Sequence, residues 1–131
     1  MPRLCTGIVT MCHALIIEDE PFIALGIQDL LEEQGVDTVD IAATEDEAVH
    51  SALSRQPDLI TADVTLLDGN GPAAVGKIRD ELGEIPVIYI TGTPDRIPSL
   101  PRSSAILIKP FSAGLFRKTF AEAVEGEASG C

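Results

Sequence analysis

The sequence predicts an α/β fold, a doubly wound sheet of five parallel strands with helices on both faces. Short runs of apolar and β-branched residues alternate with segments of helical period through five units. The 131 residues suit a single domain, and 45% of them are hydrophobic, enough for a core. Because crossovers between parallel strands are right-handed, few topologies remain, and we expect the strand order 2-1-3-4-5.

The expected elements follow in order along the chain. Strands are predicted at residues 13–17, 38–42, 59–62, 86–90 and 105–108, and helices near 20–34, 44–56, 72–82 and 112–124. Gly35 suits the position just after the first helix, and Thr44 with Glu47 predicts a capping box at the start of the second. Pro72 fits the first turn of the third helix. Three prolines between residues 94 and 101 disfavour a long regular helix there.

Apolar residues at helical spacing predict the buried side of each helix. They are Ile23, Leu25, Ile27, Leu30 and Leu31 in the first helix, Ala48, Val49, Ala52 and Leu53 in the second, and Leu115, Phe116, Phe120 and Val124 in the last. The chain has no Trp, one Tyr and four Phe, so the core is expected to be largely aliphatic.

The charge of the chain excludes some classes of function. There are 21 acidic and 9 basic residues, a formal net charge of −12. A surface that coats DNA or RNA must be cationic, so no nucleic-acid partner is expected. No apolar run reaches the roughly 18 residues of a membrane span, so no membrane association is expected. Residues 4–17 lack a clear cleavage site and lead directly into three acids, which argues against a signal peptide.

Three cysteines, Cys5, Cys12 and Cys131, lie near the two ends of the chain. An odd number without Cys-x-x-Cys spacing predicts neither a disulfide framework nor a zinc site, and it favours a reducing, cytoplasmic setting. No repeat or linker indicates a second domain. We expect an N-terminal extension at residues 1–11, one domain at residues 12–125 and a disordered tail at residues 126–131.

Charged or hydroxyl residues follow four of the predicted strands. Glu18 and Asp19 follow the first strand, Asp63 the third, Thr91 the fourth and Lys109 the fifth. In open parallel sheets, ligands bind beyond the carboxyl ends of the strands. We therefore expect a pocket with clustered carboxylates, one hydroxyl and one ammonium group at this edge of the sheet.

The chemistry expected of this pocket is phosphoryl transfer. Glu18, Asp19 and Asp63 would repel one another unless a cation neutralised them, and oxygen ligands in an open, hydrated site suit Mg²⁺. A carboxylate beside Mg²⁺ can attack a phosphoryl group and become an acyl phosphate. Mg²⁺ and Lys109 would balance the charge of the transferred group, and Thr91 would donate a hydrogen bond to it.

Other polar residues have simpler interpretations. Glu20 is expected to begin the first helix, where the helix dipole favours an acid, and Asp68 is expected to serve a turn. His13 and His50 lack partners at metal-site spacing, so structural or surface roles are expected for both. The remaining acids are interpreted as solvated helix surface.

Four motifs occur in an order and spacing that are together highly specific. They are Leu-Ile-Ile-Glu-Asp-Glu-Pro at 15–21, Pro-Asp-Leu-Ile-Thr-Ala-Asp at 57–63 with Gly71 eight residues later, Pro-Val-Ile-Tyr-Ile-Thr-Gly at 86–92, and Lys-Pro-Phe at 109–111. On these motifs the chain resembles the receiver domain of two-component response regulators, the CheY-like family. The resemblance covers about residues 12–125.

The resemblance implies a role for each residue of the pocket. Asp63 would be the phosphoacceptor. Asp19 and Asp63 would bind Mg²⁺ directly, together with the backbone carbonyl of Thr65, and Glu18 would act through water. Thr91 and Lys109 would bind the phosphoryl group, and the peptide bond between Lys109 and Pro110 would be cis.

Two features depart from the family pattern. Ile106 stands where most receivers carry a Tyr or Phe switch on the fifth strand, and the segment that is usually the fourth helix is rich in proline. In receivers, the fourth helix, the fifth strand and the fifth helix form a face that rearranges. The two departures put that rearrangement in question for this chain. Residues 89–94 (Tyr-Ile-Thr-Gly-Thr-Pro) instead resemble a subgroup named for a Phe-Ala-Thr-Gly-x-Tyr-like motif, common in alphaproteobacterial general-stress signalling.

The resemblance implies a stand-alone regulator rather than an enzyme. A sensor histidine kinase would pass a phosphoryl group to Asp63. The output would be contact with a downstream protein or phosphotransferase, or competition for phosphate as a sink or relay. Pro21, Phe22, Leu25 and Phe111 flank the pocket and are candidates for the kinase-facing surface, although Phe22 can equally belong to the core.

Two alternatives stay open at this point. The first is a phosphorylation-independent adaptor whose pocket is a relic, but the intact acid, hydroxyl and lysine positions speak against it. The second is a small aspartyl phosphatase of the haloacid-dehalogenase type. That class needs a second acid two residues after the nucleophile, where this chain has Thr65.

Overall fold

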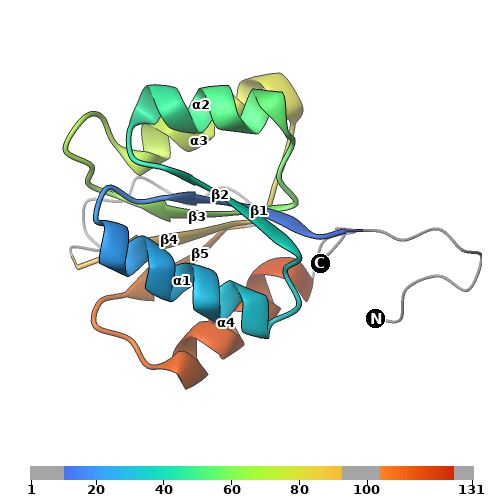
Figure 1. Ribbon diagram of the computed structural model, residues 1–131, viewed down its shortest axis with the longest axis vertical. Helices are drawn as coiled ribbons and strands as arrows, with labels where there is room; N and C mark the ends of the chain where they lie inside the picture. Colours follow the sequence, from blue (N-terminus) through green and yellow to red (C-terminus); the bar gives the residue numbers. More distant parts are fainter. Residues whose placement is uncertain (1–10, 93–103, 126–131) are drawn as a thin grey trace, which may run out of the picture.

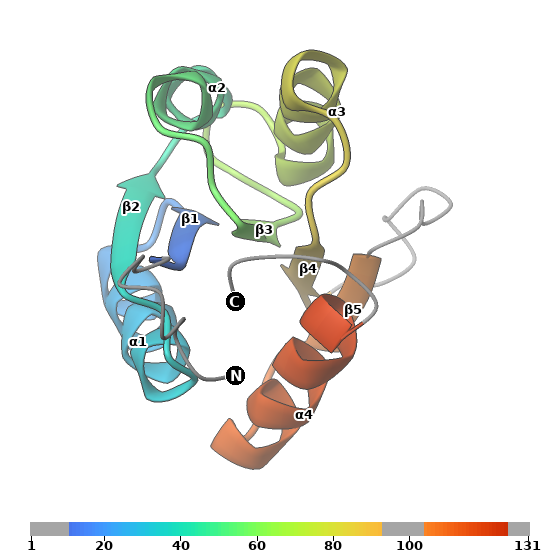
Figure 2. The ribbon, with the colours of Figure 1, turned by 90° about the vertical axis from the view of Figure 1, so that its right-hand side faces the viewer.

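The computed structural model describes residues 11–92 and 104–125. In these residues one sheet lies between two pairs of helices (Figure 1). Helices α2 (Glu45–Ser54) and α3 (Gly71–Leu82) cover one face, and α1 (Pro21–Glu33) and α4 (Ala113–Glu125) cover the other, as Figure 2 shows end-on. The predicted fold class is confirmed.

The five strands are parallel and have the order β2-β1-β3-β4-β5, as predicted. They are β1 (His13–Ile17), β2 (Thr38–Ala42), β3 (Leu59–Asp63), β4 (Val87–Thr91) and β5 (Ser104–Ile108). Ile17 lies between Ala42 and Ala62 in the register, and Asp63 lies beside Ile90. The carboxyl ends of the central strands are therefore level, and the residues that follow them meet at one edge.

The sheet has a hydrophobic core on each face because successive side chains of a strand point to opposite sides. Leu15 and Ile17 belong to the core under α2 and α3, whereas Ala14 and Ile16 belong to the core under α1 and α4. Phe116 of α4 is fully buried in the second core. Burial on both faces explains why the central strands are nearly continuous apolar runs.

The predicted helix ends at Gly35 and Thr44 are confirmed. Gly35 has φ +96°, and the N–H groups of Gly35 and Val36 donate to the carbonyl oxygens of Glu32 and Leu31, which closes the end of α1. Thr44 Oγ1 accepts from the Glu47 N–H (3.1 Å) at the start of α2. Glu47 Oε1 accepts a hydrogen bond from the N–H of Ala43 (2.9 Å), which is one residue before the capping residue.

The predicted helix faces are wrong at four positions. Ile23, Leu25, Leu53 and Leu115 are 38%, 53%, 49% and 44% exposed. The faces that contact the sheet are narrower than the apolar pattern suggested, and small residues such as Ala24, Ala48 and Ala52 are buried on them. Small side chains allow close approach of helix and sheet, a property that a count of large apolar residues does not capture.

Polar groups at the amino end of the sheet hold strands together, and His13 has the structural role that was predicted. Its ring contacts Thr38 Oγ1 (2.9 Å) and Asp40 Oδ2 (3.0 Å) on β2. The backbone N–H groups of Cys12 and His13 donate to Asp37 Oδ2 (2.7 Å) and Asp58 Oδ2 (2.9 Å).

Cys12 is disulfide-bonded, contrary to the expectation drawn from the cysteine count. Sequence spacing does not tell which cysteines meet in space, and an odd count still allows one bridge. Cys5 and Cys131 lie outside the described residues, as do the predicted extension up to residue 10, the proline-rich segment 94–101 and the predicted tail at 126–131. Within the described ranges, no helix combines the length and the apolar character needed to cross a bilayer.

Candidate functional site

Four of the five strands, all except β2, deliver one or more of the predicted site residues to the same edge of the sheet. Glu18 and Asp19 directly follow β1, and Asp63 is the last residue of β3. Thr91 ends β4, and Lys109 directly follows β5, where its backbone N–H donates to the Thr91 carbonyl oxygen (2.9 Å). The parallel register is thus what brings these residues together.

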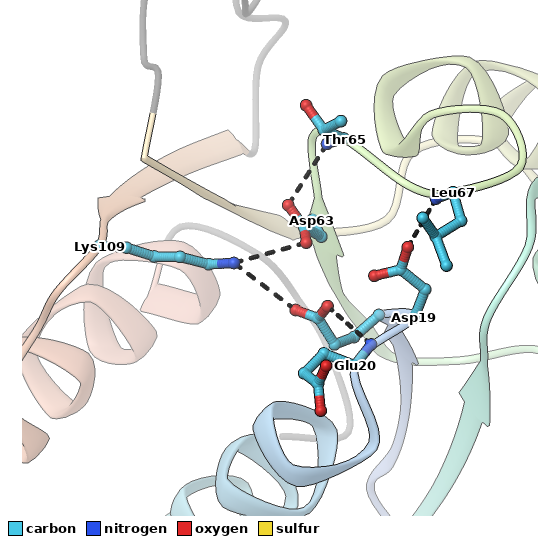
Figure 3. A network of polar contacts seen from close by, with 7 residues as sticks. Asp19, Glu20, Asp63, Thr65, Leu67 and Lys109 are labelled. Atoms are coloured by element: carbon cyan, nitrogen blue, oxygen red, sulfur yellow. Dashed lines mark hydrogen bonds and ion pairs between the residues drawn. The ribbon is translucent and has the colours of Figure 1, made fainter.

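The three carboxylates form one cluster. One oxygen atom from each of Glu18, Asp19 and Asp63 lies within 4.8 Å of the others. The Lys109 Nζ lies 3.4 Å from Asp63 Oδ2 and 3.8 Å from Glu18 Oε1. Figure 3 shows the lysine side chain reaching from β5 across to Asp63 on β3. One ammonium group therefore faces two of three carboxylates, which leaves a surplus of negative charge when all are ionised.

Glu18 is buried, with an exposure of only 2%. Its Oε2 accepts from the Glu20 N–H (3.2 Å), while its buried Oε1 has no hydrogen bond among the described residues. Burial, and then the negative charge of Asp63, raise the pKa of Glu18 to about 7 from an ordinary 4.5. The Glu20 N–H and Lys109 oppose this rise. A buried carboxylate without enough partners is a site that favours either a proton or a cation.

Asp19 and Asp63 are oriented by the loop that follows β3. The Leu67 N–H donates to Asp19 Oδ2 (2.6 Å), and the Thr65 N–H donates to Asp63 Oδ1 (3.3 Å), as Figure 3 shows. Gly71 lies against the backbone of Asp63, since a Cβ at this glycine would come within 2.1 Å of the Asp63 carbonyl oxygen. The start of α3 can approach the end of β3 because residue 71 has no side chain.

The donor set fits Mg²⁺. The cluster offers carboxylate oxygens, which are hard ligands, and none of the described residues adds a sulfur or imidazole ligand to it. Glu18 Oε1 has no hydrogen bond, and no hydrogen bond within the described ranges engages Asp19 Oδ1. Thr91 is 2% exposed. The ligand roles of Asp19, Asp63, Glu18 and the Thr65 carbonyl, and the phosphoryl-binding roles of Thr91 and Lys109, stay predictions.

The structure also bears on the expectations for other residues in and near the site. The peptide bond between Lys109 and Pro110 is cis, as the resemblance implied. Asp68 lies in the loop between β3 and α3, as expected for a turn residue, and His50 is exposed. Glu20 precedes α1 as its capping residue, but its side chain makes no capping hydrogen bond. Ile106 pairs with Tyr89 of β4 and is partly buried.

An apolar groove lies on the side of Lys109. It has a volume of about 420 Å³ and is lined by Ile23, Gly26, Ile27 and Leu30 of α1 together with residues 109–111. Phe22 is 84% exposed at the start of α1, so it does not belong to the core. Leu25 is exposed, Pro21 is exposed and Phe111 is partly buried. The predicted kinase-facing residues are thus accessible, wholly or in part.

Sequence reasoning missed two residues at the loop between β3 and α3. Leu67 lies in the loop and provides the N–H that orients Asp19, and Glu45 of α2 contacts the loop at Asn70. A backbone N–H carries no sequence signal, because every residue except proline has one. In the sequence, Glu45 cannot be distinguished from the other acids in the first turn of its helix.

Comparison with known protein families identifies the chain. Residues 14–119 match the model of the response regulator receiver domain. The chain belongs to this family. Family membership places it in two-component signalling, and it confirms the resemblance drawn from the four motifs.

Individual relatives agree with this assignment. The phyllosphere-induced regulator PhyR of Methylorubrum extorquens is 42% identical over 101 residues, covering 74% of this chain and 38% of that protein. The transcriptional regulatory protein DltR of Streptococcus agalactiae is 33% identical over 103 residues, covering 76% and 46%. The chain thus spans less than half the length of these curated relatives.

Solved structures include another PhyR receiver. The solution structure of the REC domain of the PhyR response regulator from Erythrobacter litoralis has a TM-score of 0.80 and 32% identity, covering 91% of this chain and 94% of that one. A structure of the PhyR stress response regulator has a TM-score of 0.75 and 36% identity, covering 90% and 46%. These likenesses are consistent with the stress-signalling subgroup indicated by residues 89–94.

Proposed function

We propose that this chain receives a phosphoryl group on Asp63 in a two-component phosphorelay. The observation that carries the proposal is the cluster of Glu18, Asp19 and Asp63 within 4.8 Å, with Lys109 Nζ 3.4 Å from Asp63 Oδ2. A buried acid with a raised pKa beside a carboxylate and a lysine suits a site that binds a cation and an anion together.

Each residue has a distinct part in the proposed reaction. An Asp63 carboxylate oxygen attacks the phosphorus of a donor phosphohistidine, so a P–O bond forms while the P–N bond breaks and the imidazole leaves with a proton. Lys109 and Thr91 bind the phosphoryl oxygens. Asp19, Asp63 and the Thr65 carbonyl would hold Mg²⁺, and Glu18 would act through water. Bound Mg²⁺ would offset the charge of the carboxylates and of the transferred group.

The partner proposed on the donor side is a sensor histidine kinase, contacting Pro21, Phe22, Leu25 and Phe111 beside the site. On the output side we propose a downstream protein or phosphotransferase of a stress response, in line with relatives described as a stress response regulator and an anti-anti-sigma factor. The setting proposed for this signalling is cytoplasmic.

The test uses small phosphoryl donors, which need no kinase. The protein is incubated with Mg²⁺ and acetyl phosphate or phosphoramidate, and its intact mass is measured. We expect one phosphoryl adduct on the wild type and none on Asp63→Asn. Loss of the adduct in EDTA would support the metal. If no adduct forms with any small donor or with a cognate kinase, the proposal is overturned. A phosphorylation-independent adaptor would then describe the chain better.

The phosphatase alternative gives a different result in the same assay. A haloacid-dehalogenase-type phosphatase would hydrolyse an aryl phosphate with repeated turnover. We expect no turnover, because Thr65 stands where that class needs a second acid.

A further inference from the structure

Glu45, the first residue of α2, contacts the loop between β3 and α3 through its backbone and its side chain. Its N–H donates to the Asp68 carbonyl oxygen (3.2 Å), and its Oε1 accepts from the Asn70 N–H (3.3 Å). Its Oε2 lies 2.6 Å from the Nζ of Lys77 on α3. One side chain, 18% exposed, therefore joins α2, the loop and α3.

The backbone of the loop is shaped around this side chain. Gly69 has φ +92°, and a Cβ there would lie 2.6 Å from both Cβ and Oε1 of Glu45. Glycine is required at this position both for its conformation and for the space it leaves. The Glu45–Lys77 contact, with Gly69 packed against Glu45, differs from a surface ion pair between two mobile side chains, which contributes little to stability. Lys77 also lowers the pKa of Glu45, so the carboxylate stays ionised.

The same loop holds two groups of the acidic site. Leu67 donates its N–H to Asp19 Oδ2, and Thr65 donates its N–H to Asp63 Oδ1 (Figure 3). Thr65 also pairs with Asn70 across the loop in an antiparallel bridge. Glu45 accepts a hydrogen bond from Asn70, and Asn70 pairs with Thr65, so a substitution at Glu45 is expected to affect the position of Thr65. Through the backbone of the short loop it is also expected to affect Leu67, which orients Asp19.

We infer that Glu45 is a positioning residue of the phosphoryl site: held by Lys77, it fixes the loop that orients Asp19 and presents the Thr65 carbonyl. The inference rests on the proposed function, because it concerns the same site. Glu45 is not one of the three carboxylates of the cluster. Residues that orient metal ligands typically affect metal affinity by about 10- to 100-fold. Glu45 acts through intervening residues, so the lower end of that range applies.

The test measures Mg²⁺ affinity by calorimetry on the full chain, and then adduct formation from phosphoramidate at saturating Mg²⁺. We expect Glu45→Ala to weaken Mg²⁺ binding by about tenfold and Lys77→Met to weaken it less. If Lys77 acts only through Glu45, the double variant should match Glu45→Ala alone. Because Lys77 is 56% exposed, we expect its substitution to leave the fold intact.

The matched control is Glu47→Ala. Glu47 lies in the same first turn of α2 and loses a comparable hydrogen bond, but its partner is Ala43 rather than the loop. Glu47→Ala should lower the melting temperature without changing Mg²⁺ affinity. Equal Mg²⁺ affinities for Glu45→Ala and Glu47→Ala would overturn the inference whether or not the wild type takes a phosphoryl group. Weaker binding in Glu45→Ala with no adduct on the wild type would instead support it and overturn only the proposed function.

Discussion

Acidic side chains gather at both ends of the sheet, and the two groups have opposite surroundings. At the amino end, Asp37 and Asp58 accept backbone N–H groups from the start of β1, and Asp40 contacts the His13 ring. At the carboxyl end, Glu18, Asp19 and Asp63 face one another, and Lys109 is the one cation in contact with them in the part of the chain that the structure describes. The first group satisfies hydrogen bonds within the protein. The second keeps a surplus of negative charge among the described residues when all three acids are ionised.

The largest expected difference between the two ends is in phosphorylation. Asp63→Asn should abolish the phosphoryl adduct, because the nucleophilic oxygen is lost. Asp58→Asn should take the adduct as the wild type does, while lowering the melting temperature, because its bond to the His13 N–H is weakened. Intact mass and thermal unfolding give the two readouts. An adduct on Asp63→Asn would mean that Asp63 is not the phosphoacceptor, and it would contradict the different roles given to the two ends of the sheet.

The next effect concerns how closely the backbone packs at the carboxyl end. Gly71→Ala would place a Cβ 2.1 Å from the Asp63 carbonyl oxygen. We expect the free energy of unfolding to fall by about 3 kcal/mol, measured by urea denaturation.

Gly76 of the same helix provides the matched control. A Cβ at Gly76 meets nothing within 4 Å, so Gly76→Ala should raise the free energy of unfolding by about 0.5–1 kcal/mol. A similar gain in stability for Gly71→Ala would show that helix propensity, and not the contact with Asp63, governs this region.

These two ends also show how far sequence reasoning extends. The strand order, the residues at the strand ends and the helix caps at Gly35 and Thr44 follow from local patterns, and each is confirmed. Which acids bond to the backbone and which are left without partners depends on register and side-chain direction. Asp58 and Asp63 look alike in the sequence, since each is an acid at one end of the same strand.

The misses have the same physical origin. Leu25 and Leu53 were assigned to helix faces on hydrophobicity, but small residues occupy the closest contacts. The contacts of Glu45 join segments that are distant in the sequence. No local pattern in one sequence reports contacts of that kind.

A smaller effect separates the two ends by pH. Glu18 has its pKa raised to about 7, so its ionisation destabilises the metal-free fold, and stability is lost as pH rises from about 4.5 through 7. Glu18→Gln should therefore be more stable than the wild type at pH 8 in EDTA, by about 2 kcal/mol. It should also lose Mg²⁺ affinity.

Thermal melts across this pH range, with and without Mg²⁺, provide the measurement. Glu122→Gln, an exposed substitution on α4, is the control and should follow the wild type throughout. If the wild type and Glu18→Gln show the same pH profile in EDTA, the carboxyl end does not carry the unbalanced charge described here.

The smallest effect on stability is expected for the surface beside the site. Phe22 is 84% exposed, so Phe22→Ala should change the free energy of unfolding by less than about 0.5 kcal/mol. It should nevertheless slow phosphoryl transfer from a histidine kinase while leaving the reaction with phosphoramidate unchanged. Ile41→Ala, an exposed apolar residue on β2, is the matched control. Equal transfer rates for both variants would remove Phe22 from the kinase-facing surface.

The pairing of Lys109 with Asp63 spans 46 residues of the chain, and the strand that leads to Lys109 is the last to be synthesised. Glu18 and Asp19 come from the first strand, so the site draws on both extremes of the fold. A nascent chain that has not yet released β5 from the ribosome has the acids but lacks the lysine. If Asp63 accepts a phosphoryl group as proposed, this capacity would arise only after β5 and Lys109 have been synthesised.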